Sequence, residues 1–264
     1  MMLGRNRLLD EMGLSPQWKR REQPGVARET PPATALAPVA AALPAGHPAT
    51  LASAAVPQSG AQRVEAIAQM GWEPLRLSIA ACRACPLCAQ RKQAVPGVGD
   101  ESADWLFIGE GPGADEDAQG EPFVGQAGKL LDAMLAAIAL KRGANVYIAN
   151  AVKCRPPANR TPETAEMDAC APYLRRQIAL IQPRLIVLLG RAAVQSVLGD
   201  AGSLASLRGK TLAYRDEERA IPVLVTYHPA YLLRTLPDKS KAWEDLCRAR
   251  ALMREMTAAS SAPT

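Results

Sequence analysis

Short apolar runs alternate with longer amphipathic segments along most of this chain. Four runs are continuous enough to be strands buried in a sheet, and they lie at residues 105–108, 145–151, 185–189 and 222–226. Apolar residues recur at helical spacing around them, which predicts helices at residues 64–81, 130–142 and 161–182, after Gly190, and at 239–256. This alternation is typical of an α/β fold with a mainly parallel sheet and helices on both faces.

The strand and helix pattern is confined to residues 63–257. Residues 23–62 are rich in Ala and Pro and contain no aromatic residue, a composition typical of linkers. We therefore expect residues 1–62 to form a disordered tail. A short helix near residues 7–12, followed by Trp18, makes the start of this tail either a loose tether or a docking peptide for a protein partner. Residues 258–264 are small and polar and are expected to fray.

Composition narrows the class of protein. The chain has 264 residues, is 48% hydrophobic and has a net charge of +5, which weakly favours an anionic partner such as nucleic acid. It contains no run of about 18 apolar residues, so we expect no membrane span. Its first ten residues lack an apolar signal core, so we expect a cytoplasmic protein. We also expect it to be a monomer.

Six cysteines in a reducing compartment favour a metal site or catalysis over disulfides. Four of them are candidate ligands for zinc or an iron–sulfur cluster, namely Cys82, Cys85, Cys154 and Cys170. The second pair is widely spaced, unlike the two close knuckles of zinc ribbons, which weakens the case for zinc without excluding it. Cys88 could replace Cys85, although Cys85 keeps the tight gap from Cys82. Cys247 lies on an amphipathic helix and is expected in the core.

A glycine-rich loop, residues 109–117, follows the first predicted strand and closes at residues 120–125. The carboxyl ends of strands are where open α/β sheets place their ligand sites. Glycines let the backbone approach a ligand, and the carboxylates and Phe123 offer polar contacts and a flat stacking face. The alternative is an ordinary Gly-Pro surface loop.

Four motifs stand in order along the chain: residues 109–113, 122–128, Asn150 with 153–160, and 228–234. Together they resemble the family 4 uracil-DNA glycosylases, the iron–sulfur class, over about residues 63–256. The resemblance implies a three-layer α/β/α sandwich with a four-stranded parallel sheet. It also implies a [4Fe–4S] cluster on the four candidate cysteines, and excision of uracil from uracil-containing DNA in base excision repair.

The resemblance further implies roles for single residues. Phe123 would stack on uracil, the Asn150 amide would read the pyrimidine edge, and His228 would donate a hydrogen bond to O2 of the leaving base. Other substrate contacts are implied for Asn159, Tyr231, Leu232, Leu233 and Arg234. The alternatives are structural: a core phenylalanine, a strand-end asparagine, a structural histidine and buried leucines.

The group that positions the attacking water is the open point. Other uracil glycosylase families place Asp or Asn one residue after the position of Glu110, where this chain has Gly111. Backbone carbonyls of this loop, Glu110 or Glu116 must then orient the water, and the sequence does not decide among them.

Three alternatives compete with an enzyme that turns over. A relative that traps uracil covalently carries an inserted basic loop with a reactive histidine after the Asn-containing strand, but residues 154–160 contain no histidine. The second alternative is a nucleic-acid-binding module stabilised by zinc or an iron–sulfur cluster, and the third is an electron-transfer protein. Either would account for the cysteines. They would leave the set of Phe123, Asn150 and His228 as coincidence.

Overall fold

A computed structural model describes residues 60–199, 202–216 and 219–261. The proposed docking helix and almost all of the linker lie outside the described residues, as does the end of the C-terminal tail. Among the described helices, none combines the length and the apolar character needed to cross a bilayer.

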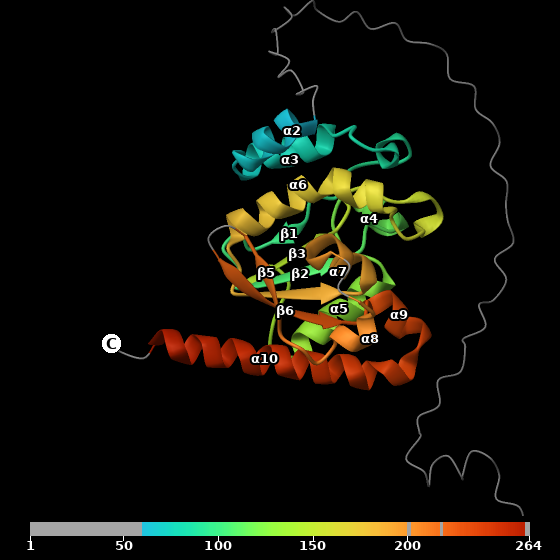
Figure 1. The fold of residues 1–264 in the computed structure, drawn as a ribbon. Coiled ribbons are helices and arrows are strands. Elements are labelled where there is room, and N and C mark those ends of the chain that lie inside the picture. The colour runs from blue at the N-terminus through green and yellow to red at the C-terminus, as the bar shows by residue number, and fades with distance from the viewer. Residues whose placement is uncertain (1–59, 200–201, 217–218, 262–264) are drawn as a thin grey trace, which may run out of the picture. The chain divides into compact units, whose positions relative to one another are not determined.

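The described residues form one six-stranded sheet with the order β1-β3-β2-β4-β6-β5 (Figure 1). Its four central strands are parallel and match the four apolar runs: β2 (Trp105–Gly109), β3 (Val146–Asn150), β4 (Leu185–Leu189) and β6 (Ala220–Thr226). Every residue of β2, β3 and β4 is buried, because helices cover both faces of a parallel sheet. The predicted fold class is therefore confirmed.

The strand count is larger than predicted. Two antiparallel edge strands extend the sheet, β1 (Val98–Gly99) beside β3 and β5 (Leu212–Arg215) beside β6. They carry no readable apolar run, because β1 has only two residues and alternate residues of β5 face the solvent. Strands are predicted from a buried apolar run or from strict alternation of apolar and polar residues, and neither β1 nor β5 has such a sequence.

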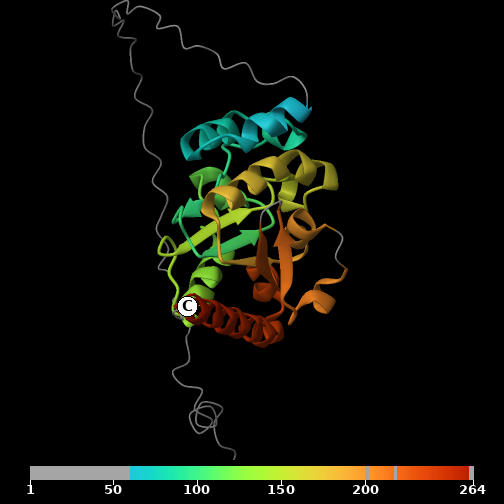
Figure 2. The same ribbon diagram turned by 60° about the vertical axis from the view of Figure 1, so that its left-hand side comes forward.

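Two groups of helices enclose the sheet (Figures 1 and 2). On one face, α5 (Gln126–Ala137), α9 (Pro229–Arg234) and α10 (Lys239–Ser261) share a core with Trp105 and Phe107. On the other face, α6 (Thr164–Ile181) and α7 (Arg191–Leu198) share a core with Leu106 and Ile108. Successive strand residues thus point to opposite cores, as the pleat requires.

A further pair of helices covers α6 on its outer side (Figure 1). They are α2 (Gly60–Ala68) and α3 (Trp72–Ala81), and their buried residues pack with Cys154, Cys170 and Tyr173 in a third cluster. The predicted break between them is confirmed, with Gly71 as the N-cap of α3. The cysteine-bearing segments are therefore held between this pair and the α/β/α sandwich.

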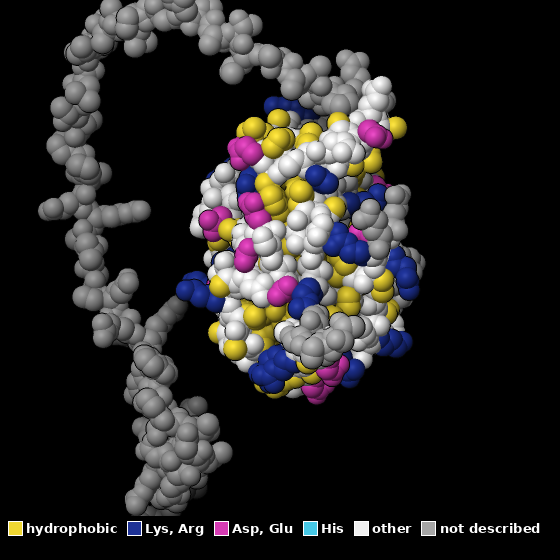
Figure 3. Space-filling model, turned by 90° about the vertical axis from the view of Figure 1, so that its left-hand side faces the viewer, with side chains coloured by type: hydrophobic (Ala, Val, Ile, Leu, Met, Phe, Trp, Pro, Cys, Tyr) yellow, Lys and Arg dark blue, Asp and Glu magenta, His cyan; other side chains and the backbone are white. Residues whose placement is uncertain are grey.

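The remaining elements are short. They comprise α4 (Ala114–Gln119) in the glycine-rich loop, α8 (Leu204–Leu207), and the 3₁₀ turns η1 (Pro86–Ala89), η2 (Pro157–Asn159) and η3 (Leu236–Asp238). The carboxyl ends of the four parallel strands lead into α4, η2, α7 and α9, so these elements lie together at one end of the sheet. At the opposite end, basic and acidic side chains are interspersed on the surface (Figure 3).

Candidate active site

A cavity of about 740 Å³ opens at the carboxyl ends of the four parallel strands. Each strand end contributes to its lining: Glu110 follows β2, Asn150 ends β3, Gly190 follows β4 and His228 follows β6. Such a crevice is the usual ligand site of an open α/β sheet. The structure thus brings three residues selected from the sequence into one cavity, together with Phe123 from the glycine-rich loop.

Phe123, Asn150 and His228 form the inner wall of this cavity. The rings of Phe123 and His228 lie with centroids 5.5 Å apart at an interplanar angle of 31°. Phe123 and Asn150 also meet over Gly109, where an added Cβ would lie 2.5 Å from both the Phe123 ring and Asn150 Oδ1. Glycine at this position is therefore what allows the amide and the aromatic ring to converge.

Two polar atoms of this wall are buried without a hydrogen-bond partner, Asn150 Oδ1 and His228 Nε2. An unsatisfied buried polar atom costs about 1–3 kcal/mol, so native structures contain few of them. Both residues line the cavity, so a ligand with matching polar groups can reach both atoms there.

His228 is neutral at physiological pH. Burial lowers its pKa to about 4, and the positive charge of Arg234 acts in the same direction. Its Nδ1 accepts a hydrogen bond from the backbone N–H of Ala230 at 3.2 Å, which caps α9. Because Nδ1 is the acceptor, the proton of the neutral ring belongs on Nε2. His228 therefore presents an unengaged, uncharged donor.

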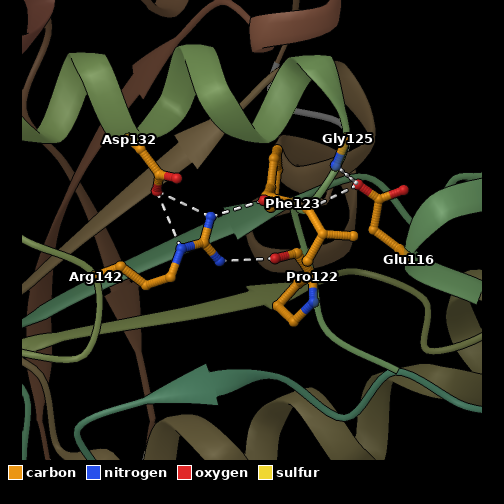
Figure 4. Close-up of polar contacts among 7 residues, drawn as sticks. Glu116, Pro122, Phe123, Gly125, Asp132 and Arg142 are labelled. Carbon is orange, nitrogen blue, oxygen red and sulfur yellow. Dashed lines mark hydrogen bonds and ion pairs between the residues drawn. The ribbon is translucent and has the colours of Figure 1, made fainter. Parts of the chain in front are cut away.

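The carboxylate of Glu116 binds backbone rather than facing the solvent. Its Oε1 accepts from the N–H groups of Val124 and Gly125 at 3.0 and 3.1 Å (Figure 4). Its Oε2 accepts from Gly113 N–H at 3.0 Å. These three bonds tie the two halves of the glycine-rich loop together. The geometry favours a structural role for Glu116, and its part in orienting water stays a prediction.

Glu110 and Gly111 lie directly after β2. Burial raises the pKa of Glu110, while a hydrogen bond with Thr161 and the charge of Arg234 oppose the shift. At Gly111, an added Cβ would lie 2.8 Å from Val152 Cγ2. An Asp or Asn here would have to displace the Val152 side chain. The acidic residue that directly follows β2 is Glu110.

The remaining sequence-selected residues surround the cavity mouth. Tyr231, Arg234 and Asn159 line it, and Asn159 Oδ1 accepts a hydrogen bond from Arg155 Nε at 2.7 Å. The prediction that Leu232 reaches DNA is wrong: it is 1% exposed and belongs to the core below α9. Leu233 is 42% exposed, since one helical position turns the side chain from the core to the solvent.

Five cysteines from distant segments line another, much smaller cavity. Its lining includes Cys82, Cys85, Cys154 and Cys170, together with Cys88. Cys247 is half-buried on α10 and does not line it.

The surroundings of these thiols include N–H donors that point at two of the sulfurs. Arg91 Nη1 donates to Cys154 Sγ at 2.9 Å, and the backbone N–H of Lys153 donates to Cys170 Sγ at 3.3 Å. Four thiols with N–H donors aimed at their sulfurs suit a cluster held by thiolates. Over residues 60–199, 202–216 and 219–261, however, no group of three or more Cys, His, Asp or Glu is already arranged to hold a metal ion.

One residue of this region has no signal in the sequence. Arg142 is the last residue of the helix predicted at residues 130–142, whereas α5 ends at Ala137. It contacts the backbone beside Phe123 (Figure 4). No local pattern could reveal this, because the partners lie about twenty residues away in sequence.

Comparison with known proteins agrees with this geometry. Residues 96–247 match the uracil DNA glycosylase superfamily. The chain is 44% identical over 165 residues to a type-4 uracil-DNA glycosylase of Sulfurisphaera tokodaii, covering 61% of this chain and 75% of the relative. It is 45% identical over 159 residues to that of Archaeoglobus fulgidus (59% and 79%), and 40% identical over 181 residues to that of Pyrobaculum aerophilum (67% and 92%). This chain therefore belongs to the uracil DNA glycosylase superfamily.

Proposed function

We propose that this chain is a uracil-DNA glycosylase, which takes uracil out of the DNA stack and hydrolyses its N-glycosidic bond, leaving an abasic site for base excision repair. The relatives named type-4 uracil-DNA glycosylases support this activity. The observation that carries it in the structure is the pair of buried, unpartnered atoms in the cavity, Asn150 Oδ1 and His228 Nε2.

A flipped uracil would supply what both atoms lack. Uracil offers an N3–H donor, which Asn150 Oδ1 can accept, and an O2 acceptor, to which His228 Nε2–H can donate. Phe123 would stack on the ring. The edge of cytosine lacks the N3–H donor, so a site that reads this group rejects cytosine by leaving the Asn150 acceptor unpaired.

Breaking the glycosidic bond places negative charge on the departing base and oxocarbenium character on the sugar. A donor aimed at O2 stabilises this charge more than it stabilises the neutral ground state, so it lowers the barrier. His228 acts as such a donor while uncharged, because burial keeps its pKa near 4. For the water we favour Glu110, since Glu116 is engaged with three backbone N–H groups.

We further propose that Cys82, Cys85, Cys154 and Cys170 hold a [4Fe–4S] cluster. The cluster would act structurally, by joining segments that are distant in sequence. The glycosylase domain would comprise residues 63–257 and act as a monomer on uracil-containing DNA. The exposed Leu233, which lies on α9 between the cavity-lining Tyr231 and Arg234, would fill the gap left by the flipped base, and Arg234 would meet a phosphate.

The decisive experiment is release of free uracil from an oligonucleotide that carries one uracil. Uracil release with many turnovers and an alkali-labile abasic site are expected. Binding without base release would favour a nucleic-acid-binding module. A protein–DNA adduct that survives denaturation would favour the covalently trapping relative. Iron and sulfide analysis of the purified protein, with its colour, separates an iron–sulfur cluster from zinc.

A further inference from the structure

Phe123 is held in an unfavourable backbone conformation. Its φ angle is +57°, in the left-handed region that residues with bulky side chains seldom adopt. A conformation of this kind costs about 1–3 kcal/mol and persists only where the surroundings enforce it. The loop that carries the stacking ring must therefore contain interactions that hold this turn.

Arg142 supplies such interactions on the carbonyl side of the turn. Its Nη1 donates to the carbonyl oxygen of Pro122 at 2.8 Å, and its Nη2 donates to that of Phe123 at 2.7 Å (Figure 4). Asp132 of α5 fixes the guanidinium from behind, accepting from Arg142 Nε at 3.0 Å. The planar fork of arginine suits this arrangement, because a lysine ammonium cannot bind both carbonyls and the carboxylate in one plane.

The surroundings of the turn are closed on both sides. Glu116 binds the N–H groups of Val124 and Gly125, which follow the turn. α5 packs against the Phe123 carbonyl, since an added Cβ at Gly128 would lie only 1.8 Å from its oxygen. Glu116 therefore holds the amides after the turn, whereas Arg142 binds the Pro122 and Phe123 carbonyls within it. Locking these carbonyls also sets the direction of the ring.

We propose that Arg142, oriented by Asp132, is a positioning residue for uracil capture, which acts by locking the left-handed turn at Phe123 so that the ring faces the flipped base. The proposal deepens the proposed function and rests on it. Arg142 touches no substrate in this scheme and works only through the Phe123 ring. Its effect must therefore disappear when that ring is absent.

A double-mutant cycle tests this requirement. A misplacement of about 1 Å costs up to about 10²-fold in rate, so Arg142→Met should lower single-turnover uracil release by about 10- to 100-fold. In a Phe123→Leu background, the same change should cost less than about threefold. Binding to a duplex with a tetrahydrofuran abasic analogue should change less than about threefold, since no base is stacked there. Equal losses in both backgrounds would overturn the proposal.

A second measurement is independent of activity. The chain has only two phenylalanines, Phe107 and Phe123, so fluorophenylalanine labelling gives two ¹⁹F resonances. Arg142→Met should shift or broaden the Phe123 resonance and leave that of Phe107, which is fully buried in β2, unchanged. An unchanged Phe123 resonance would overturn the proposal even if the wild-type chain released no uracil.

Two further variants separate positioning from general stability. Arg142→Lys keeps the charge but loses the fork, so it should recover only part of the rate and of the spectrum. Arg76→Met removes a matched arginine, which pairs with Glu101 and lies over the ring of Trp72. This control should leave both the rate and the Phe123 resonance unchanged. A loss with Arg76→Met as large as that with Arg142→Met would show that the effect is not specific.

Discussion

Replacing His228 by alanine removes an uncharged donor, Nε2–H, from the wall of the cavity. In the unbound protein Nε2 is already buried and unpartnered, so binding a base costs this donor no further desolvation. Loss of one such preorganised donor typically lowers the rate by about 10²–10³, which corresponds to about 2.7–4 kcal/mol. His228→Ala should therefore slow single-turnover uracil release by that factor. Affinity for uracil DNA should change far less, because phosphate contacts dominate it.

The same substitution also removes a helix cap. His228 Nδ1 accepts from Ala230 N–H at the start of α9, and loss of a cap costs about 1 kcal/mol of stability. His228→Asn is the matched control, since asparagine is a good N-cap residue but its amide is too short to replace Nε2. It should restore the melting temperature without restoring the rate.

Single-turnover kinetics with excess enzyme, together with DNA affinity and thermal unfolding, separate these effects. The leaving-group role is refuted if His228→Ala binds poorly but cleaves bound DNA at the native rate, which would make His228 a positioning element. Recovery of the rate by His228→Asn would also refute it, because the cap alone would then explain the loss.

Four further outcomes are expected. The unfolded chain takes up a proton on His228 below the ordinary pKa of 6.5, whereas the folded chain does so only near pH 4. The free energy of unfolding should therefore fall as the pH drops from 6.5 to 4, by at most about 1.4 kcal/mol per pH unit. Denaturant titrations should show a shallower fall for His228→Asn. Asn150→Ala should weaken both capture of the flipped base and the rate, measured as a rise in KM and a fall in kcat on a uracil oligonucleotide, and equal activity on cytosine and uracil in the wild type would contradict its reading role. Iron analysis should show that Cys154→Ala loses the cluster and that Cys247→Ala keeps it, and unchanged iron in Cys154→Ala would remove this ligand from the set. A chain lacking residues 1–59 should release uracil within about tenfold of the full-length rate, and a larger loss would assign the N-terminal segment a part in excision.

The sequence was informative where burial leaves a local pattern. The strands at residues 105–108 and 185–189 are readable because both of their faces are covered, so nearly every position is apolar. Asn150 and His228 were identifiable because they follow such strands, and parallel strands bring their carboxyl ends to one edge. The motif resemblance added the roles that spacing alone could not supply.

What the sequence missed depends on contacts between distant segments. The burial of Leu232 follows from how α9 lies on the core, which a six-residue helix does not encode in its own pattern. Likewise, the carboxylate of Glu116 and the guanidinium of Arg142 are charged groups that usually face solvent, and only the folded loop turns them onto backbone partners. The edge strand β5 alternates in exposure, but its four residues, Leu212 to Arg215, do not alternate between apolar and polar, so its sequence gives no strand signal.

The distribution of the cavity wall over four strand ends has a consequence for how activity appears during folding. Glu110, Asn150, Gly190 and His228 follow one another at intervals of about forty residues, each at the end of a separate strand–helix unit. No fragment that lacks one unit contains the complete wall, and every contact across it joins residues far apart in sequence. Such non-local pairings form slowly, because loop closure must precede them. Recovery of uracil release after dilution from denaturant should therefore lag behind recovery of helical circular dichroism. The rate at which activity returns then reports the last step of sheet assembly.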